Sequence, residues 1–255
     1  MGSIELTVHE GVALLTLNRP DVHNVINRET MIQWDRQLDR IAEDSSIHAI
    51  LLTGSGEKTF CAGGDLKWFT HLTEEKEVRD MSEQMQKLLN RMYEGHLPVI
   101  GVLNGSAYGG GCEVLTACHY RIAAEDVSFQ FRQSAMGVVT GWGGGLRLLR
   151  QLGRSRALEV LLGGDRIDAQ KALAMGLVDR VVPRSELMNA AVAFASMIVG
   201  RSPESIKSFL ELARFAEHND TEATRRRETD LFVSCWQGPW FRNAVDSFLH
   251  KRKKS

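Results

Sequence analysis

A glycine-rich stretch with one acidic residue, at 104–115, is the part of the sequence most suited to chemistry. Gly109, Gly110 and Gly111 stand together before Glu113, and the apolar residues that follow predict a helix beginning there. Free N–H groups and the helix dipole at such an N-terminus would stabilise an oxygen on which negative charge develops. A structural explanation is equally available, since glycines often only make a turn and an acid in the first helical turn complements the dipole.

A second run of small residues, at 60–67, reads Phe-Cys-Ala-Gly-Gly-Asp-Leu-Lys. Small residues allow another molecule to approach the backbone closely. Asp65 is a suitable N-cap for a short helix after the glycines. Both glycine-rich stretches therefore follow short apolar segments and present backbone groups, which is a favourable arrangement for binding a small molecule.

Neither of the common nucleotide-binding motifs is present. In the glycine-containing segment 53–59, Glu57 separates Gly56 from Lys58, so the Gly-Lys pair of a P-loop is missing. The segment 141–146 begins Gly-Trp-Gly-Gly-Gly but has leucine where a dinucleotide fingerprint ends in glycine. We therefore expect no phosphate loop and no dinucleotide cofactor.

The four cysteines have no spacing that predicts a metal site. They are Cys61, Cys112, Cys118 and Cys235, and the Cys-x5-Cys-His run that includes Cys118 matches no zinc-ligand pattern. We expect them to be buried, reduced thiols in a cytoplasmic protein with no bound metal.

The overall composition is that of an ordinary globular protein. The chain has 255 residues, of which 43% are hydrophobic and 25% charged, with a formal net charge of −1. Near-neutral charge argues against general nucleic-acid binding. No apolar run approaches the about 18 residues of a membrane span. The first residues lack the basic and apolar regions of a secretory signal, although a leader already removed would leave no trace.

The elements that would position the glycine-rich stretches alternate between strand and helix. Apolar, β-branched runs predict strands at 12–17, 49–53, 99–103, 120–123 and 177–182. Helical spacing predicts helices at 28–43, 74–92, 155–162 and 169–175, the last ending at Gly176. This alternation predicts an α/β fold with a mostly parallel sheet.

The chain beyond about residue 185 contains helix signals only. Ser202 and Pro203 predict the start of a helix to about 218, and Asp220 or Thr221 the start of another to about 235. A third helix is expected at 241–250, before a basic tail at 250–254 that we expect to be solvated. We therefore divide the chain into a core at 1–195 and a helical region at 196–255.

Taken together and in order, these motifs resemble the crotonase superfamily, whose best-known member is enoyl-CoA hydratase. The resemblance extends over about residues 4 to 250. The matching residues are Leu17-Asn18-Arg19-Pro20 with Asn24, segment 60–67, Pro98-Val99-Ile100, Asn104-Gly105, segment 109–113, Gly137, segment 141–144, segment 162–169 and segment 174–178.

This resemblance implies a fold and a site. The fold is a spiral of ββα turns followed by a helical region that assembles trimers or dimers of trimers. The oxyanion hole falls on the N–H groups of Gly64 and Gly110, and Gly141 is also placed at the catalytic centre. Coenzyme A enters as part of the substrate, with no cofactor bound permanently. Residues implied in binding it are His23, Ala62, Gly63, Asp65, Leu66 and Trp142, with Lys67 or Arg19 near its phosphates.

The sequence departs from the hydratases at one position of the acid–base pair. The first glutamate of the pair matches Glu113, but the second, four residues before Gly137, is replaced by Gln133. An amide cannot take up or release a proton under these conditions, so the two-carboxylate mechanism is incomplete. The double-bond isomerases of the family depend on the same second acid.

The methylmalonyl- and ethylmalonyl-CoA decarboxylases of the superfamily keep only the first glutamate. The ethylmalonyl type is also similar around Trp142 and in segments 228–231 and 236–239. Decarboxylation needs an oxyanion hole but no base to remove a proton. We therefore predict decarboxylation of a short branched malonyl-CoA, with the acyl group itself left open.

Three alternatives remain beside this prediction. One is a hydratase- or isomerase-type reaction that uses Glu113 alone, because a single carboxylate in a dry pocket could activate water. Another is an acyl-CoA binder without activity. The third is an RNA-binding relative, but Arg225, Arg226 and Arg227 form the one basic cluster that supports it, and a solvated helix face explains them equally well.

Overall fold

The computed structural model describes residues 2–252, and the side chains of residues 2–250. Its main sheet has six strands in the order β1-β2-β3-β5-β7-β10. All neighbours in it are parallel except β1 and β2, and Ile50 pairs with Val99 at the centre. The strands are β1 (Ile4–His9), β2 (Val12–Leu17), β3 (Ala49–Gly54), β5 (Val99–Leu103), β7 (Tyr120–Ala124) and β10 (Arg180–Val182). The predicted mostly parallel sheet is confirmed.

A second, smaller sheet lies beside the first and was not predicted from the sequence. Its order is β4-β6-β8-β9, and its strands have only two or three residues each. They are β4 (Thr59–Cys61), β6 (Ser106–Tyr108), β8 (Ser128–Gln130) and β9 (Ile167–Asp168). Each of β3, β5 and β7 thus continues into a short strand before the next helix, which makes the repeated ββα turn of the spiral.

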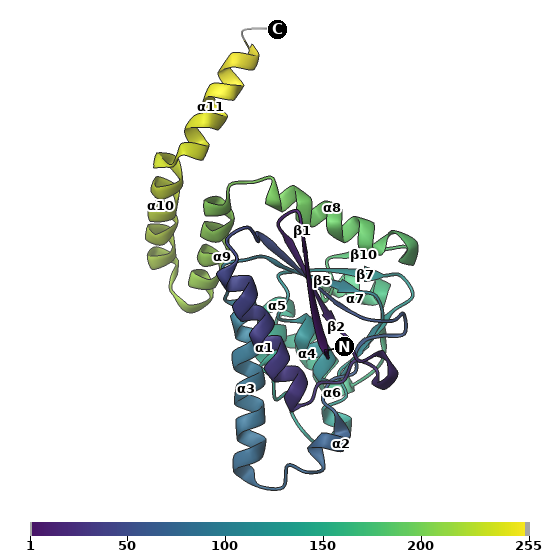
Figure 1. Ribbon diagram of the computed structural model, residues 1–255. Coiled ribbons are helices and arrows are strands. Elements are labelled where there is room, and N and C mark those ends of the chain that lie inside the picture. The colour runs from purple at the N-terminus through teal and green to yellow at the C-terminus, as the bar shows by residue number, and fades with distance from the viewer. Residues whose placement is uncertain (1, 253–255) are drawn as a thin grey trace.

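Helices cover both sheets (Figure 1). In α1 (Arg28–Glu43), the Asn27 side chain caps the first turn, and Met31, Trp34, Leu38 and Ile41 are buried at helical spacing. α3 (Glu75–Tyr93) packs against α1. The other helices of this part are α2 (Leu66–Phe69), α4 (Gly110–Leu115), α5 (Gly144–Leu152), α6 (Arg154–Gly163) and α7 (Ala169–Met175), with short 3-10 turns η1 (Pro20–Val22), η2 (Ser134–Met136) and η3 (Arg184–Glu186).

The C-terminal part differs from its prediction in one helix. α8 (Leu187–Val199) was not predicted, and it packs against β2, β3, β5 and β7. The boundary expected between residues 195 and 196 therefore falls inside a helix that covers the main sheet. The predicted strand at 177–182 is also shorter than expected, because residues 177–179 form a turn after Gly176 ends α7.

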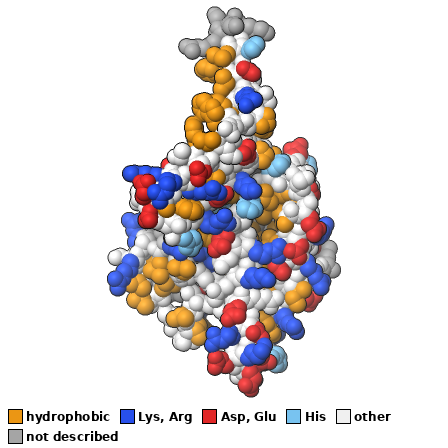
Figure 2. Space-filling model, turned by 90° about the vertical axis from the view of Figure 1, so that its left-hand side faces the viewer, with side chains coloured by type: hydrophobic (Ala, Val, Ile, Leu, Met, Phe, Trp, Pro, Cys, Tyr) orange, Lys and Arg blue, Asp and Glu red, His pale blue; other side chains and the backbone are white. Residues whose placement is uncertain are grey.

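The last three helices follow the prediction closely. α9 (Pro203–His218) begins at a Ser202 cap, and α10 (Thr221–Gln237) begins at an Asp220 cap. α10 packs against α9, and α11 (Pro239–Arg252) continues beyond α10 and extends away from the body of the molecule (Figure 1). Figure 2 shows hydrophobic side chains along this projecting segment.

Of the basic tail at 250–254, residues 253 and 254 lie outside the described part. Within the described part, no helix is both long and apolar enough to cross a membrane.

Candidate active site

The two glycine-rich stretches meet because their preceding strands are neighbours. β4 and β6 pair in parallel, so residues 62–64 and 109–111, which follow these strands, lie at the same end of the small sheet. A Cβ atom built on Gly63 would lie 2.7 Å from the Gly110 nitrogen, so only glycine fits at this close approach. In the described chain, neither the Gly64 N–H nor the Gly110 N–H donates a hydrogen bond to another group. The predicted pair of free N–H groups is thus brought together.

Aromatic rings flank both of these N–H groups. The Phe69 ring occupies the space that a side chain at Gly64 would fill, and the Trp142 ring does the same at Gly110. Trp142 is buried, so its ring is a wall of the site as well as a core side chain. Apolar walls exclude water, which strengthens the attraction between the N–H dipoles and a developing negative charge.

Glu113 lies one turn along α4 from Gly110 and has an exposed fraction of 2%. One carboxylate oxygen, Oε2, accepts hydrogen bonds from the N–H groups of Trp142 (2.8 Å) and Gly144 (3.0 Å). The other, Oε1, accepts from the Gly141 N–H (3.3 Å) and from Nε2 of Gln133 (3.1 Å). The four predicted residues Glu113, Gln133, Gly141 and Trp142 therefore form one cluster.

Burial raises the pKa of Glu113, because the ionised form loses its hydration. The hydrogen bonds from the N–H groups of Gly144, Trp142 and Gly141 and from Gln133 act in the opposite direction, but burial is the larger effect. A carboxylate whose pKa is raised is well suited to exchange protons with a substrate.

Gln133 is nine-tenths buried, just before η2, and its amide is oriented by its contact with Glu113. Because Nε2 donates to the carboxylate, the amide oxygen Oε1 points elsewhere. This buried Oε1 has no hydrogen-bond partner in the described chain. An unpaired buried acceptor costs free energy, so the position favours a ligand that brings an O–H or N–H donor.

The residues predicted to bind coenzyme A line the loop beside β4. The Ala62 N–H donates to the His23 carbonyl, and His23 Nδ1 lies 2.9 Å from the Thr59 hydroxyl. Arg19 and Asp65 form an ion pair at 3.1 Å. The Asp65 side chain also caps α2, as predicted.

Leu66 and Lys67 follow on α2 and are exposed, Leu66 with a fraction of 61%. Their side chains are accessible to a ligand that crosses this loop. The structure therefore groups the predicted residues, and coenzyme A contact at each of them remains a prediction.

Several residues that support the site were not predicted. Ser82 and Gln86 of α3 donate to the Gly141 carbonyl, at 2.6 and 3.1 Å. Arg147 of α5 is buried beside Glu113's helix and binds the Trp142 carbonyl at 2.8 Å. One sequence signal could have indicated that Arg147 is buried: it lies on the helix face that also carries the buried residues Gly144 and Leu148.

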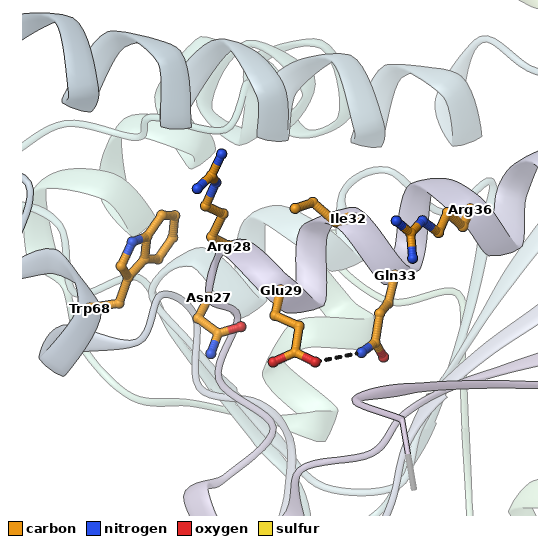
Figure 3. A pocket seen from close by; sticks show the side chains of 7 residues that line it. All are labelled: Asn27, Arg28, Glu29, Ile32, Gln33, Arg36 and Trp68. Atoms are coloured by element: carbon orange, nitrogen blue, oxygen red, sulfur yellow. Dashed lines mark hydrogen bonds between the residues drawn. The ribbon is translucent and has the colours of Figure 1, made fainter.

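Open hollows on the surface lie away from Glu113. One of about 540 Å³ lies at the start of α1 beside Trp68, with Arg28, Glu29 and Gln33 in its wall (Figure 3). Another of about 1120 Å³ lies between α1, α3 and α9.

The four cysteines are free, and three of them are buried, with burial raising the pKa of Cys61 and Cys118 to about 12.

Comparison with known proteins agrees with this geometry. The family model described as Enoyl-CoA hydratase/isomerase matches residues 7–255. The chain belongs to this family. It is 34% identical over 242 residues to a Short-chain-enoyl-CoA hydratase of Clostridium acetobutylicum, covering 95% of this chain and 92% of the relative. The crystal structure of an enoyl-CoA hydratase from Bacillus anthracis superimposes with a TM-score of 0.94 at 30% identity, over 98% of this chain and 96% of that one.

Family membership confirms the predicted superfamily and the predicted fold. It also supports the prediction that the protein is an enzyme acting on an acyl-CoA thioester. The predicted preference for decarboxylation is not supported, because the more similar relatives are named hydratases. An Ethylmalonyl-CoA decarboxylase from Bos taurus is also similar, at 29% identity over 93% of this chain and 79% of the relative. The hydratase alternative fits these relatives better than the decarboxylase prediction does.

Proposed function

We propose that this enzyme adds water to the double bond of a 2-enoyl-CoA thioester, with Glu113 as its one proton-transferring side chain. The observation that carries the proposal is the cluster around Glu113. A buried carboxylate with a raised pKa is held one helical turn from the free Gly110 N–H. The hydratases among the relatives support the same reaction type.

The proposed reaction uses the Gly64 and Gly110 N–H groups for the thioester oxygen. Glu113 takes a proton from water while the water oxygen bonds to the β-carbon of the substrate. The electron pair of the double bond moves towards the thioester, whose oxygen becomes an enolate held by the two N–H groups. The enolate then takes the proton from Glu113 at its α-carbon. Water has been added, and the carboxylate is restored without a second acid.

Gln133 has a specific part in this scheme. Its Nε2 donates to Glu113 Oε1, and its unpartnered Oε1 would accept one O–H of the attacking water. Because the amide cannot accept that proton, the proton stays on the hydroxyl group of the product. One water is thereby oriented by two side chains, of which only Glu113 exchanges a proton.

Decarboxylation of a malonyl-type thioester is the second candidate. The amide at Gln133 favours it, because a second carboxylate there would repel the carboxylate of such a substrate. At contact distance the repulsion is roughly 1–4 kcal/mol, depending on the local dielectric. The ionised form of Glu113 would repel that carboxylate too, which makes hydration the better-supported reaction.

We further propose that coenzyme A is the carrier part of the substrate and that no cofactor is bound permanently. Its contacts would be His23, Ala62, Gly63, Asp65 and Leu66, with Arg19 and Lys67 near the phosphates. Homotrimers or dimers of trimers, built by the C-terminal helices, are the proposed assembly. The four free cysteines are consistent with a reducing, cytoplasmic setting.

A panel of CoA thioesters tests the reaction. Wild-type protein should remove the conjugated absorbance of crotonyl-CoA, and methylmalonyl- and ethylmalonyl-CoA should release little carbon dioxide. Glu113→Gln should lower hydration by about 10²–10⁴-fold, since general acid–base catalysis contributes about that much. Gln133→Glu is the matched variant, because it restores the acid pair and should favour hydration further. Brisk loss of carbon dioxide with unchanged crotonyl-CoA would overturn the proposal in favour of the second candidate.

A further inference from the structure

Arg147 on α5 is a buried cation whose hydrogen bonds all go to neutral groups. Its exposed fraction is 4%, and no carboxylate of the described chain forms an ion pair with it. Its Nε–H donates to the Thr116 hydroxyl (3.1 Å), Nη1 to the Asn90 side chain (3.1 Å), and Nη2 to the Trp142 carbonyl (2.8 Å). Burying a charge without a charged partner costs free energy.

Two of these contacts lead to Glu113 from opposite sides. On α4, the Thr116 hydroxyl that receives the Arg147 Nε–H donates in turn to the Glu113 backbone carbonyl, at 2.7 Å. On the other side, Arg147 binds the carbonyl of Trp142, whose own N–H donates to the Glu113 carboxylate. Both the backbone and the carboxylate of Glu113 are therefore connected to one guanidinium.

Close packing around Arg147 restricts the position of segment 141–144, whose N–H groups bind the Glu113 carboxylate. Gly143 has φ 79°, and a Cβ atom there would lie 2.9 Å from Arg147 Nη1. The Tyr93 ring lies on another side, with its centroid 5.9 Å from the guanidinium carbon. Asn90 on α3 completes the enclosure. A change in the position of Arg147 would thus move the 141–144 segment.

The titratable groups that act on Arg147 come from several elements. Tyr93 and Glu94 lie at the end of α3, Cys118 follows α4, and Glu113 is the nearest buried acid on α4. Burial lowers the pKa of Arg147, and Glu113 opposes that effect most among these groups.

Other charged residues share a hollow of about 480 Å³ with Arg147 but have partners of their own. Arg121 pairs with Asp179, and Arg150 pairs with Glu217, each at 2.8 Å. Arg214 donates to the Glu94 carbonyl at 2.7 Å. Arg121 and Arg150 therefore have acidic partners, whereas Arg147 has none among the described residues, and the acids that act on it are Glu113 first and then Glu94.

We propose that Arg147 is a positioning residue for Glu113, which fixes the two segments that hold the carboxylate and favours its ionised form. This inference rests on the proposed function in one respect, which is that Glu113 is the proton-transferring group. Arg147 makes no hydrogen bond to the Glu113 carboxylate, and its side chain donates to Thr116, Asn90 and the Trp142 carbonyl. It acts through Thr116 and through the Trp142 carbonyl.

Four variants separate charge from position. Arg147→Gln removes the charge and most contacts, while Arg147→Lys keeps the charge and loses the forked geometry. Thr116→Val removes one link and no charge. Arg150→Gln is the matched control, because it removes a cation from the same helix that is already paired with Glu217.

The readouts are the titration of Glu113 and the kinetics with the thioester that the panel identifies. Infrared difference spectra give the titration midpoint of the Glu113 carboxylate directly, with Glu113→Gln identifying its band. Arg147→Gln should raise this midpoint, since a nearby cation favours a carboxylate. The acidic limb of kcat/KM should move to higher pH by the same amount, because the active base is the ionised form. Arg147→Lys and Arg150→Gln should keep the wild-type midpoint.

Thr116→Val and Arg147→Lys should lower kcat by about 10- to 100-fold with little change in KM, as misplacement of a catalytic group does. An unchanged midpoint in Arg147→Gln would overturn the charge role, and wild-type kcat in both Thr116→Val and Arg147→Lys would overturn the positioning role. The infrared midpoint is measured without turnover. A wild-type protein that hydrates nothing would therefore overturn the proposed function and leave this test in place.

Discussion

Glu113 illustrates how a single side chain can be both well bonded and electrostatically costly. Its carboxylate accepts three backbone N–H bonds and one amide bond, which would be ample for a structural acid. Burial nevertheless raises its pKa. The structural explanation for an acid in the first helical turn does not account for that cost, whereas proton exchange with a substrate does.

The stability of Glu113→Gln relative to that of the wild type should increase as pH rises. A carboxyl group whose pKa is raised in the folded state destabilises the fold when it ionises. This cost is absent below its unfolded pKa, about 4.3, and is complete above its folded pKa. The melting temperature of Glu113→Gln minus that of the wild type should therefore increase from pH 4 to pH 8. A difference that is constant or falls across this range would contradict the raised pKa.

Lys67→Ala should weaken binding of an acyl-CoA by about 1.4- to 5-fold, since exposed ion pairs contribute about 0.2–1 kcal/mol. The lysine is exposed next to the loop that carries Asp65. Binding of the matching acyl-pantetheine, which lacks the nucleotide, should be unchanged. Calorimetry at two salt concentrations measures both, and higher salt should reduce the difference. Equal affinity of the wild type for the two ligands would show that Lys67 and its loop do not hold the nucleotide.

At the scale of elements, the site depends on the close approach of α4 to β4. α4 has only six residues, and all but its first are buried. A Cβ atom on Gly111 would overlap the carbonyl oxygen of Cys61, which ends β4. The glycine therefore permits a helix-to-strand distance that brings the Gly110 N–H beside the Gly63–Gly64 backbone.

Gly111→Ala should lower the free energy of unfolding by about 1–3 kcal/mol, as overpacking of a tight core contact does. The matched control is Gly163→Ala at the end of α6, where the nearest atom to a new Cβ would be Asp165 Oδ2 at 3.6 Å. That change should be neutral or stabilising, because alanine is the better helix former. Urea denaturation measures both variants. Equal stability of Gly111→Ala and the wild type would mean that the α4–β4 contact can relax.

At the scale of the whole molecule, α10 and α11 carry several large apolar side chains that are exposed. Trp236 and Trp240 are each about half exposed, and Phe232 is more so. The rings of Trp236 and Phe241 are in contact across the junction of α10 and α11, tilted by 31° with centroids 4.0 Å apart. Contiguous exposed apolar patches of this kind mark protein–protein interfaces.

Removal of α11 by truncation after Gly238 should reduce the proposed trimer or hexamer to smaller species. Trp240→Glu should have the same direction of effect, because it places a charge in the expected interface. Asp246→Asn on the same helix is the matched control and should leave the assembly unchanged. Light scattering measures the mass of each. A wild-type mass of 28.5 kDa at micromolar concentration would contradict the proposal.

Local sequence signals were enough to predict most helices and the long strands. The 28–43, 169–175 and 203–218 helices were predicted at their observed bounds, because apolar spacing and caps at Asn27, Asp168 and Ser202 act within a few residues. The motif order also identified the family, and it predicted Glu113, Gly64 and Gly110 as candidate site residues. These features depend on neighbours in the chain, so the chain alone reveals them.

Tertiary structure was needed wherever a feature depends on residues distant in sequence. β4, β6, β8 and β9 have two or three residues each, too few for a periodic signal, and pairing alone makes them strands. The orientation of the Gln133 amide follows from its contact with Glu113, 20 residues away. Arg147 looks like one more charged helix residue until its contacts with Asn90, Thr116 and Trp142 are seen. A buried charge is recognised only by what surrounds it, and those surroundings are assembled by the fold.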